Sequence, residues 1–151
     1  MNAGIPVVGH IGLTPQMVSK LGGYKVQGTD IDTARKLIKD AKALEEAGVF
    51  MIGSLECVPD RLAELVTKEV SIPVVGMGSG PYTDGQALNI YDILGLFDRF
   101  TPRLVKKYAN LSEDILRALK QFKEAVDLGK FPDPDHSYPI NEEVLNQLKK
   151  K

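Results

Sequence analysis

A single carboxylate, Glu56, directly follows an apolar run at residues 49–55 that has the composition of a buried strand. Its other neighbours, Cys57 and Val58, are apolar as well. Placing a charged carboxylate among such residues costs free energy unless the group has a partner or a task. One such task is that of a general base in a partly desolvated pocket. The residues alone are equally consistent with a structural role, in which Glu56 caps the next helix or pairs with a lysine.

A histidine, His10, has the equivalent place after a short β-branched run at residues 5–8. An imidazole there could act as a base, a metal ligand or a hydrogen-bond donor to a substrate. By residue chemistry alone, a histidine that only hydrogen bonds to the backbone of its loop is the preferred interpretation.

A glycine-rich loop begins at Gly76 and continues through Gly78, Ser79 and Gly80. Glycines allow the backbone to approach a ligand closely. The loop is not a dinucleotide-binding fingerprint, because Pro81 stands where the third glycine should be. The loop therefore either contacts a ligand, through residues such as Gly78 and Ser79, or forms a tight turn.

The elements that must position these residues alternate between short apolar runs and amphipathic segments. Strands are predicted at 5–8, 49–55 and 72–77, and helices at 14–22, 32–47, 59–70, 102–108, 112–128 (capped by Ser112) and 141–148. Residues 86–94 are ambiguous, and we interpret them as a short helix leading into a strand near 90–94; residues 131–139 are predicted to be extended. Buried strands that alternate with helices are typical of an α/β protein with a parallel sheet.

The chemically interesting residues Glu56, His10 and Gly78 each lie just past the end of a predicted strand. In a (β/α)₈ barrel these strand ends converge on one active site, so the barrel is favoured over an open doubly wound sheet. A complete barrel needs about 250 residues. The 151 residues therefore predict the second half of a (β/α)₈ TIM-type barrel with C-terminal helices. We expect one domain over 1–151, with the partial barrel at about 4–95 and the C-terminal helices and tail at about 96–151.

The composition argues against several classes of function. The net charge is −1 and no basic face is apparent, so nucleic-acid binding is not expected. With one cysteine, Cys57, the chain can form neither an internal disulfide nor a thiolate metal cluster. No apolar run approaches the roughly 18 residues of a membrane span, and no signal-peptide pattern is present. We expect a cytoplasmic protein that does not contact a membrane.

Four motifs in fixed order resemble the ketopantoate hydroxymethyltransferase family. They are GHIGLTPQ at 9–16, GGYKVQG at 22–28, LECVP at 55–59, and GMGSG at 76–80 with TDGQ at 83–86. Any one of them alone would be weak, but the first three in series are highly specific. The resemblance extends over about residues 4–138, nearly the whole chain.

This resemblance implies a one-carbon transfer from 5,10-methylenetetrahydrofolate to 3-methyl-2-oxobutanoate, which gives ketopantoate on the route to pantothenate and coenzyme A. It implies that Glu56 is the catalytic base and that His10, Gly78 and Ser79 bind the substrate. It also implies Mg²⁺ as a cofactor, with its ligands outside this chain, because nothing here matches the metal-binding half of the family. The expected partners are the 2-oxoacid, the folate, and further copies of the chain or a complementing N-terminal half.

Two alternatives stay open at this point. The chain could be a catalytically incomplete half-barrel that acts as a structural or complementing subunit. It could also belong to another enolate-forming 2-oxoacid enzyme of the phosphoenolpyruvate mutase or isocitrate lyase type, although the motifs at 22–28 and 55–59 argue against this.

Overall fold

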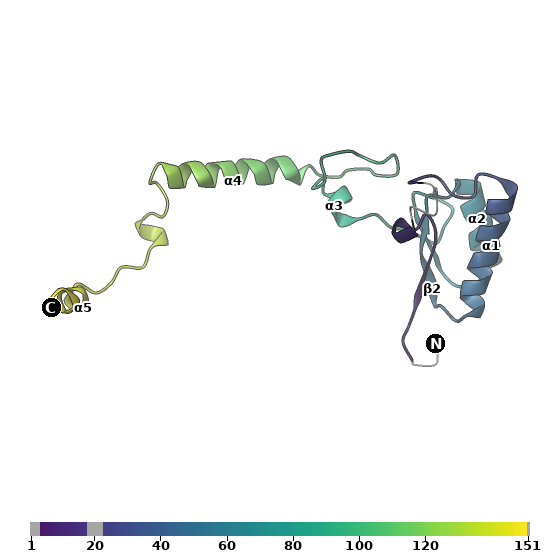
Figure 1. The fold of residues 1–151 in the computed structure, drawn as a ribbon, viewed down its shortest axis with the longest axis horizontal. Helices are drawn as coiled ribbons and strands as arrows, with labels where there is room; N and C mark the ends of the chain where they lie inside the picture. Colours follow the sequence, from purple (N-terminus) through teal and green to yellow (C-terminus); the bar gives the residue numbers. More distant parts are fainter. Residues whose placement is uncertain (1–3, 18–22, 151) are drawn as a thin grey trace. The chain divides into compact units, whose positions relative to one another are not determined.

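The computed structural model describes residues 4–17 and 23–150 (Figure 1). The chain forms two compact units, Met1–Ala109 and Asn110–Lys151. The first unit contains the residues that the sequence singled out for chemistry. The division of the chain at about residue 96 that the sequence suggested stays a prediction.

The first unit is built on a parallel sheet of four strands in the order β1-β2-β3-β4. The strands are β1 (Val8–Gly12), β2 (Met51–Glu56), β3 (Val74–Met77) and β4 (Gly85–Gln86). Helix α1 (Ile31–Glu46) connects β1 to β2, and helix α2 (Asp60–Glu69) connects β2 to β3. Such helical crossovers are the usual connection between parallel neighbours, whereas residues 78–84 join β3 to the two-residue strand β4 without a helix. The predicted α/β class with a parallel sheet is therefore confirmed.

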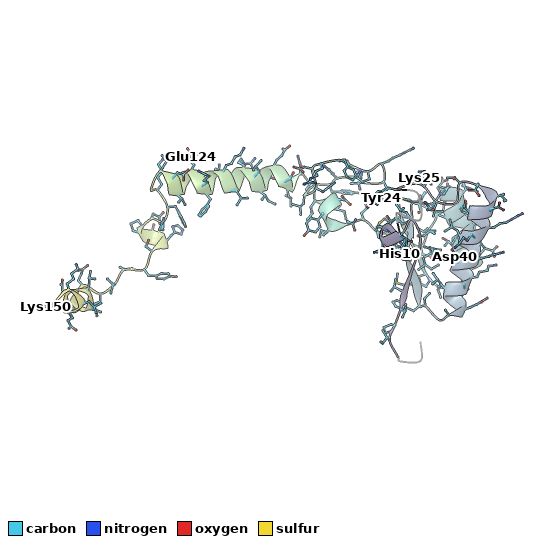
Figure 2. The ribbon with its side chains drawn as sticks, viewed as in Figure 1. His10, Tyr24, Lys25, Asp40, Glu124 and Lys150 are labelled. Carbon is cyan, nitrogen blue, oxygen red and sulfur yellow. The ribbon has the colours of Figure 1, made fainter. Side chains whose placement is uncertain are left out.

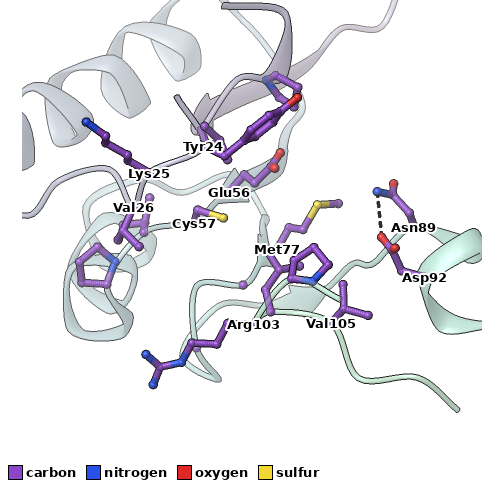
Figure 3. A pocket seen from close by; sticks show the side chains of 18 of the residues that line it. Tyr24, Lys25, Val26, Glu56, Cys57, Met77, Asn89, Asp92, Arg103 and Val105 are labelled. Atoms are coloured by element: carbon purple, nitrogen blue, oxygen red, sulfur yellow. Dashed lines mark hydrogen bonds between the residues drawn. The ribbon is translucent and has the colours of Figure 1, made fainter. Parts of the chain in front are cut away.

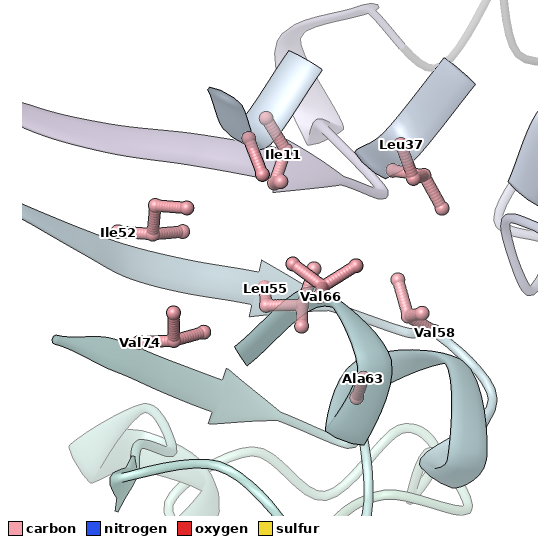
Figure 4. Close-up of a cluster of buried hydrophobic side chains, with 9 residues drawn as sticks. Ile11, Leu37, Ile52, Leu55, Val58, Ala63, Val66 and Val74 are labelled. Carbon is pink, nitrogen blue, oxygen red and sulfur yellow. The ribbon is translucent and has the colours of Figure 1, made fainter. Parts of the chain in front are cut away.

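The hydrophobic core lies between this sheet and the two helices (Figure 4). Its buried side chains are Ile11, Leu37, Ala41, Ile52, Leu55, Val58, Ala63, Val66 and Val74. Ile52 and Leu55 both belong to the core, although residues three positions apart point to opposite faces of a regular strand. The pairing of β2 with β3 is irregular between these two residues, which resolves the conflict.

The ends of α1 follow from its sequence. The side chain of Asp30 caps the helix by accepting hydrogen bonds from the backbone N–H groups of Asp32 (3.1 Å) and Thr33 (3.0 Å). Gly48, with φ of 87°, follows the last turn in the left-handed conformation that glycine adopts without strain.

Several predicted elements of the first unit are corrected by the structure. Residues 5–7 are not a strand, because β1 begins at Val8, where pairing with Met51 of β2 begins. Residues 90–94 are not a strand either: Ile90–Ile93 form the short helix α3. No helix forms at 102–108, where one turn closes between Pro102 and Val105. The segment at 14–22 begins with a 3-10 turn, η1 (Pro15–Met17), and residues 18–22 lie outside the described residues.

The absence of a helix at 102–108 has a tertiary cause. Leu104 packs directly against the backbone of Gly78, so closely that a Cβ atom built on Gly78 would lie 2.6 Å from the Leu104 Cβ. This contact holds the segment in an irregular path against the glycine-rich loop, and the local helical pattern is overridden.

The second unit contains helix α4 (Leu111–Asp127), the 3-10 turn η2 (Pro134–His136) and helix α5 (Glu142–Lys149). Neither helix has a buried residue (Figure 2, where Glu124 marks α4). The predicted cap at Ser112 is wrong: the N-cap position is Asn110, to which the Ser112 hydroxyl donates a hydrogen bond of 3.2 Å. The predicted extended segment at 131–139 is interrupted by η2. Among the described helices of both units, none is long and apolar enough to cross a membrane.

Candidate active site

Glu56 is the last residue of β2 and is 9% exposed, which makes it one of two buried polar residues in the core of the described chain. The preceding residue, Leu55, points into the core beneath the helices. Alternation along the strand then directs Glu56 to the opposite face of the sheet. The irregular pairing of β2 between Ile52 and Leu55 therefore determines the face of the sheet to which the Glu56 carboxylate points.

The carboxylate of Glu56 contacts the imidazole of His10. Parallel pairing of β1 and β2 brings the two together, with His10 Nε2 3.1 Å from Glu56 Oε2 and 3.0 Å from the carbonyl oxygen of Leu13. A carbonyl oxygen can only accept a hydrogen bond, so Nε2 must carry the proton. The same N–H group therefore serves both acceptors and holds one oxygen of the carboxylate in place.

The backbone around Glu56 is held from three sides. The N–H of Leu13 donates to the carbonyl oxygen of Glu56 (2.8 Å), and the N–H of Cys57 donates to that of Met77 (2.9 Å). The N–H of Gln27 donates to the carbonyl oxygen of Cys57 (2.8 Å). These bonds hold Cys57 at a φ of 50°, the only positive φ among the described non-glycine residues. A left-handed residue of this kind costs about 1–2 kcal/mol and is typical of functional sites.

Ser79 reinforces the same turn. Its side chain is fully buried, and its hydroxyl donates to the carbonyl oxygen of Leu55 (2.6 Å) while accepting from the N–H of Val58 (3.1 Å). Ser79 thus bridges the residues on either side of Glu56 and Cys57. Its hydroxyl is engaged with the backbone, and the predicted contact of Ser79 with a substrate stays a prediction.

The thiol of Cys57 lies next to the carboxylate. Burial raises the pKa of the Cys57 thiol, and the nearby negative charge of Glu56 raises that pKa further. A thiol with a raised pKa is protonated at neutral pH and is a poor nucleophile. Cys57 is therefore a small apolar neighbour of Glu56.

A cavity of about 950 Å³ opens in front of Glu56 (Figure 3). Gly78 lines it, whereas His10 and Ser79 are not among its lining residues, and the contact of Gly78 with a substrate stays a prediction. His10 does not touch the cavity itself but contacts Glu56, which lines it. Sequence reasoning missed four charged residues of the lining, Lys25, Asp60, Asp92 and Arg103. Asp60 is the first residue of helix α2, and the other three come from irregular segments or the four-residue helix α3, where no strand end signalled them.

No metal site is formed by the described residues themselves. Within residues 4–17 and 23–150, no group of three or more histidine, cysteine, aspartate or glutamate side chains is arranged to hold a metal ion. The pair formed by His10 and Glu56 offers too few ligands for Mg²⁺, which favours octahedral oxygen coordination. The donor set of this chain does not fit the Mg²⁺ that the resemblance implies.

Glu56 lies at the carboxyl end of its strand, whereas His10 lies in the middle of β1 and not past its end as predicted. Taken together, these features define an α/β protein with a paired histidine and glutamate on neighbouring parallel strands, beside a cavity of substrate size. The carboxyl ends of the strands are the location of active sites in parallel α/β enzymes.

The chain belongs to the ketopantoate hydroxymethyltransferase family, whose model matches residues 1–134. It is 55% identical over 148 residues to the 3-methyl-2-oxobutanoate hydroxymethyltransferase of Syntrophomonas wolfei, covering 98% of this chain and 53% of that protein. The proteins of the same name from Enterococcus faecalis and Carboxydothermus hydrogenoformans are 52% and 51% identical, over 98% of this chain and 54% and 53% of their own lengths. The chain spans about half the length of the curated relatives it matches.

Proposed function

We propose that this chain is part of an enzyme that transfers a hydroxymethyl group from 5,10-methylenetetrahydrofolate to 3-methyl-2-oxobutanoate, with water as a co-reactant and ketopantoate as the product. The relatives reported above are named 3-methyl-2-oxobutanoate hydroxymethyltransferase, which supports the hydroxymethyl transfer and the oxoacid of this proposal. The single observation that supports it in this chain is the buried carboxylate of Glu56, held by His10 Nε2 at 3.1 Å and lining the cavity. The proposed pathway is pantothenate and coenzyme A biosynthesis, in the cytoplasm.

In this proposal Glu56 removes the proton from C3 of the oxoacid, the carbon beside the ketone. Oε2 accepts the hydrogen bond of His10, and among the described residues no hydrogen bond engages Oε1. Oε1 is therefore available to take the proton, while the imidazole fixes the plane of the carboxylate. Because Glu56 is largely shielded from water, it is not held in a hydration shell and can face the C–H bond.

The resulting carbanion, stabilised as an enolate, attacks the one-carbon unit of the folate, and the C3–H bond is replaced by a C3–C bond. Both C–N bonds that held this carbon to the folate are broken, and water supplies the oxygen of the new hydroxyl group. The two folate nitrogens take up one proton from that water and the proton that Glu56 removed, so that tetrahydrofolate leaves. We assign to His10 the role of a positioning residue for Glu56, and to Gly78 and Ser79 the predicted contacts near the substrate. Mg²⁺ remains an expected cofactor with ligands outside this chain, and none of these steps is assigned to it.

The proposal extends to the architecture. The four-stranded parallel sheet with α1 and α2 on one face is consistent with the second half of a (β/α)₈ barrel, whose remaining strands would cover the face that carries Glu56. The complementing half, or further copies of the chain, would then be the partners. The chain alone would be a complementing subunit, and the assembled protein would be the enzyme.

An assay of ketopantoate formation tests this function. The chain would be measured alone and after addition of the part of the Syntrophomonas wolfei relative that it does not match, with a panel of 2-oxoacids as substrates. We expect turnover of 3-methyl-2-oxobutanoate only in the mixture. Preference for another 2-oxoacid would instead indicate a different enolate-forming enzyme.

A further inference from the structure

Besides Glu56 and Asp60, whose carboxylate accepts a hydrogen bond from the backbone N–H of Arg61 (2.8 Å), the cavity carries charged side chains at two separate places. Lys25 and Arg103 lie on one side of it, and Asp92 with Asn89 lies on the other, with Glu56 and Met77 between them (Figure 3). Among the described residues, none of the three charged side chains takes part in an ion pair: the recorded pairs involve other residues. The side with Lys25 and Arg103 can therefore bind an anionic group of a ligand, and the side with Asp92 can bind hydrogen-bond donors of the same ligand.

The volume of the cavity also exceeds what the oxoacid needs. Pockets of about 300–1,000 Å³ enclose ligands of drug size, and this one measures about 950 Å³. An acid of five carbon atoms fills only a small part of that space. The remainder is available to a second, longer ligand that reaches from one charged side to the other.

We propose that the folate co-substrate crosses this cavity with its aminopyrimidinone edge on Asp92 and Asn89 and its glutamate carboxylates toward Lys25 and Arg103. This assignment rests on the proposed function, which supplies the identity of the co-substrate. It names the residues that would recognise each end of the molecule.

The chemistry of each end fits the side that receives it. An aminopyrimidinone presents two adjacent N–H donors, which a carboxylate can accept in parallel. The amide Nδ2 of Asn89 donates to Asp92 Oδ2 at 3.4 Å, which orients that carboxylate. At the other side, the exposed ammonium and guanidinium groups of Lys25 and Arg103 complement carboxylates.

The middle of the ligand then falls in the middle of the cavity. A folate carries its one-carbon unit between the pterin ring and the aminobenzoyl group. In the proposed orientation this unit lies over the central wall, where Glu56 and the apolar side chain of Met77 line the cavity. The carbon to be transferred is thereby presented where Glu56 deprotonates the oxoacid.

Equilibrium binding of two probes to this chain tests the assignment. The probes are 5-formyltetrahydrofolate, which has both ends, and 4-aminobenzoylglutamate, which lacks the pterin. We expect Asp92→Asn to weaken binding of 5-formyltetrahydrofolate by about tenfold or more, because it loses a charge-assisted pair of hydrogen bonds, and to leave binding of 4-aminobenzoylglutamate unchanged. Lys25→Gln and Arg103→Gln should weaken binding of both probes. Asp98→Asn, at an exposed aspartate outside the cavity lining, is the matched control and should change neither affinity.

The outcomes separate this assignment from the function on which it rests. If the wild-type chain binds 5-formyltetrahydrofolate and Asp92→Asn binds it equally well, or loses both probes alike, the orientation is wrong while the folate-dependent function stands. If the wild-type chain binds neither probe, the assignment of these residues to the folate is overturned, whereas the function itself is tested by the assay of ketopantoate formation in the mixture. Unfolding curves of each variant exclude loss of folding as the cause, and Arg103, being exposed, can be replaced without disturbing the core.

Discussion

Helices α1 and α4 have similar lengths, 16 and 17 residues, and both have an apolar stripe along one side. In α1 that stripe packs on the sheet, and Leu37 and Ala41 are buried. In α4 the corresponding residues Leu119 and Phe122 are 61% and 56% exposed. Periodicity thus formed a helix in both cases, but α1 packs on strands of its own unit, whereas the described residues of the second unit form no strand.

We expect this difference to separate the two units in function as well as in stability. The first unit has buried strands, and the ends of those strands hold Glu56 in a fixed position. The second unit consists of locally stabilised helices, with no buried residue in α4 or α5. Perturbations should therefore have large effects in the first unit and small ones in the second.

The largest effect is expected at Glu56. In the reconstituted enzyme, Glu56→Gln should lower kcat by about 10²–10⁴-fold, the range that a general base contributes. Glu124→Gln on α4, the same chemical change in the second unit, should leave kcat unchanged. Steady-state kinetics of the two variants measures both effects. A larger loss of kcat in Glu124→Gln than in Glu56→Gln would contradict the expected difference between the two units.

The next effect concerns the core. Ile52→Ala should lower the free energy of unfolding by about 2–5 kcal/mol, because it leaves a cavity beside fully buried neighbours. Leu119→Ala, in the exposed stripe of α4, should change it by no more than about 0.5 kcal/mol. Denaturant unfolding measures both. A loss at Leu119 as large as that at Ile52 would show that the stripe of α4 is covered in solution.

Two glycines sharpen the comparison further, since both have left-handed backbones. At Gly12, with φ of 89°, a Cβ atom would lie 2.3 Å from the carbonyl oxygen of Glu56, whereas at Gly129, with φ of 65°, it would meet nothing within 4 Å. Gly129→Ala should cost about 1–2 kcal/mol from strain alone. Gly12→Ala adds overpacking of about 1–3 kcal/mol and should also displace Glu56. Equal losses of unfolding free energy in the two variants would contradict the close contact at Gly12.

The smallest effect is expected at the helix caps, and it depends on pH. Hydrogen bonds from the Thr33 hydroxyl and then from the Thr33 backbone N–H lower the pKa of Asp30 below its ordinary value of 3.8. Since the folded-state pKa is the lower one, the stability that charged Asp30 contributes is present above 3.8 and is lost as the pH falls through the folded-state pKa.

Melting temperatures of two alanine variants check this cap. Asp30→Ala should lower the melting temperature at neutral pH, and the difference from wild type should shrink as the solution is acidified. Asn110→Ala is the control, because Asn110 makes no side-chain cap hydrogen bond in α4. A deficit in Asp30→Ala that persists unchanged in acid would mean that the charge of Asp30 plays no part in capping.

The sequence predicted best those features that depend on local pattern. The helices at 32–47 and 59–70, the strand at 72–77 and the position of Glu56 at a strand end all follow from periodicity and apolar runs. The failure at 102–108 has a tertiary cause, because the contact of Leu104 with Gly78 is not encoded locally.

The candidate site was predictable only in part for the same reason. The motifs and strand ends pointed to Glu56 and His10, which the structure joins by one hydrogen bond. The bridge made by Ser79, and the charges of Lys25, Asp92 and Arg103 around the cavity, arise from segments that meet only in three dimensions. No spacing along the chain could reveal them.

The most direct test of Glu56 as the base is exchange of the C3 proton of 3-methyl-2-oxobutanoate in deuterated water, followed by NMR without any folate. The enzyme is this chain combined with the uncovered part of the Syntrophomonas wolfei relative. Wild-type protein and Glu124→Gln should incorporate deuterium at equal rates, and Glu56→Gln should be slower by about 10²-fold or more. Exchange by Glu56→Gln at the wild-type rate would contradict the assignment of Glu56 as the base.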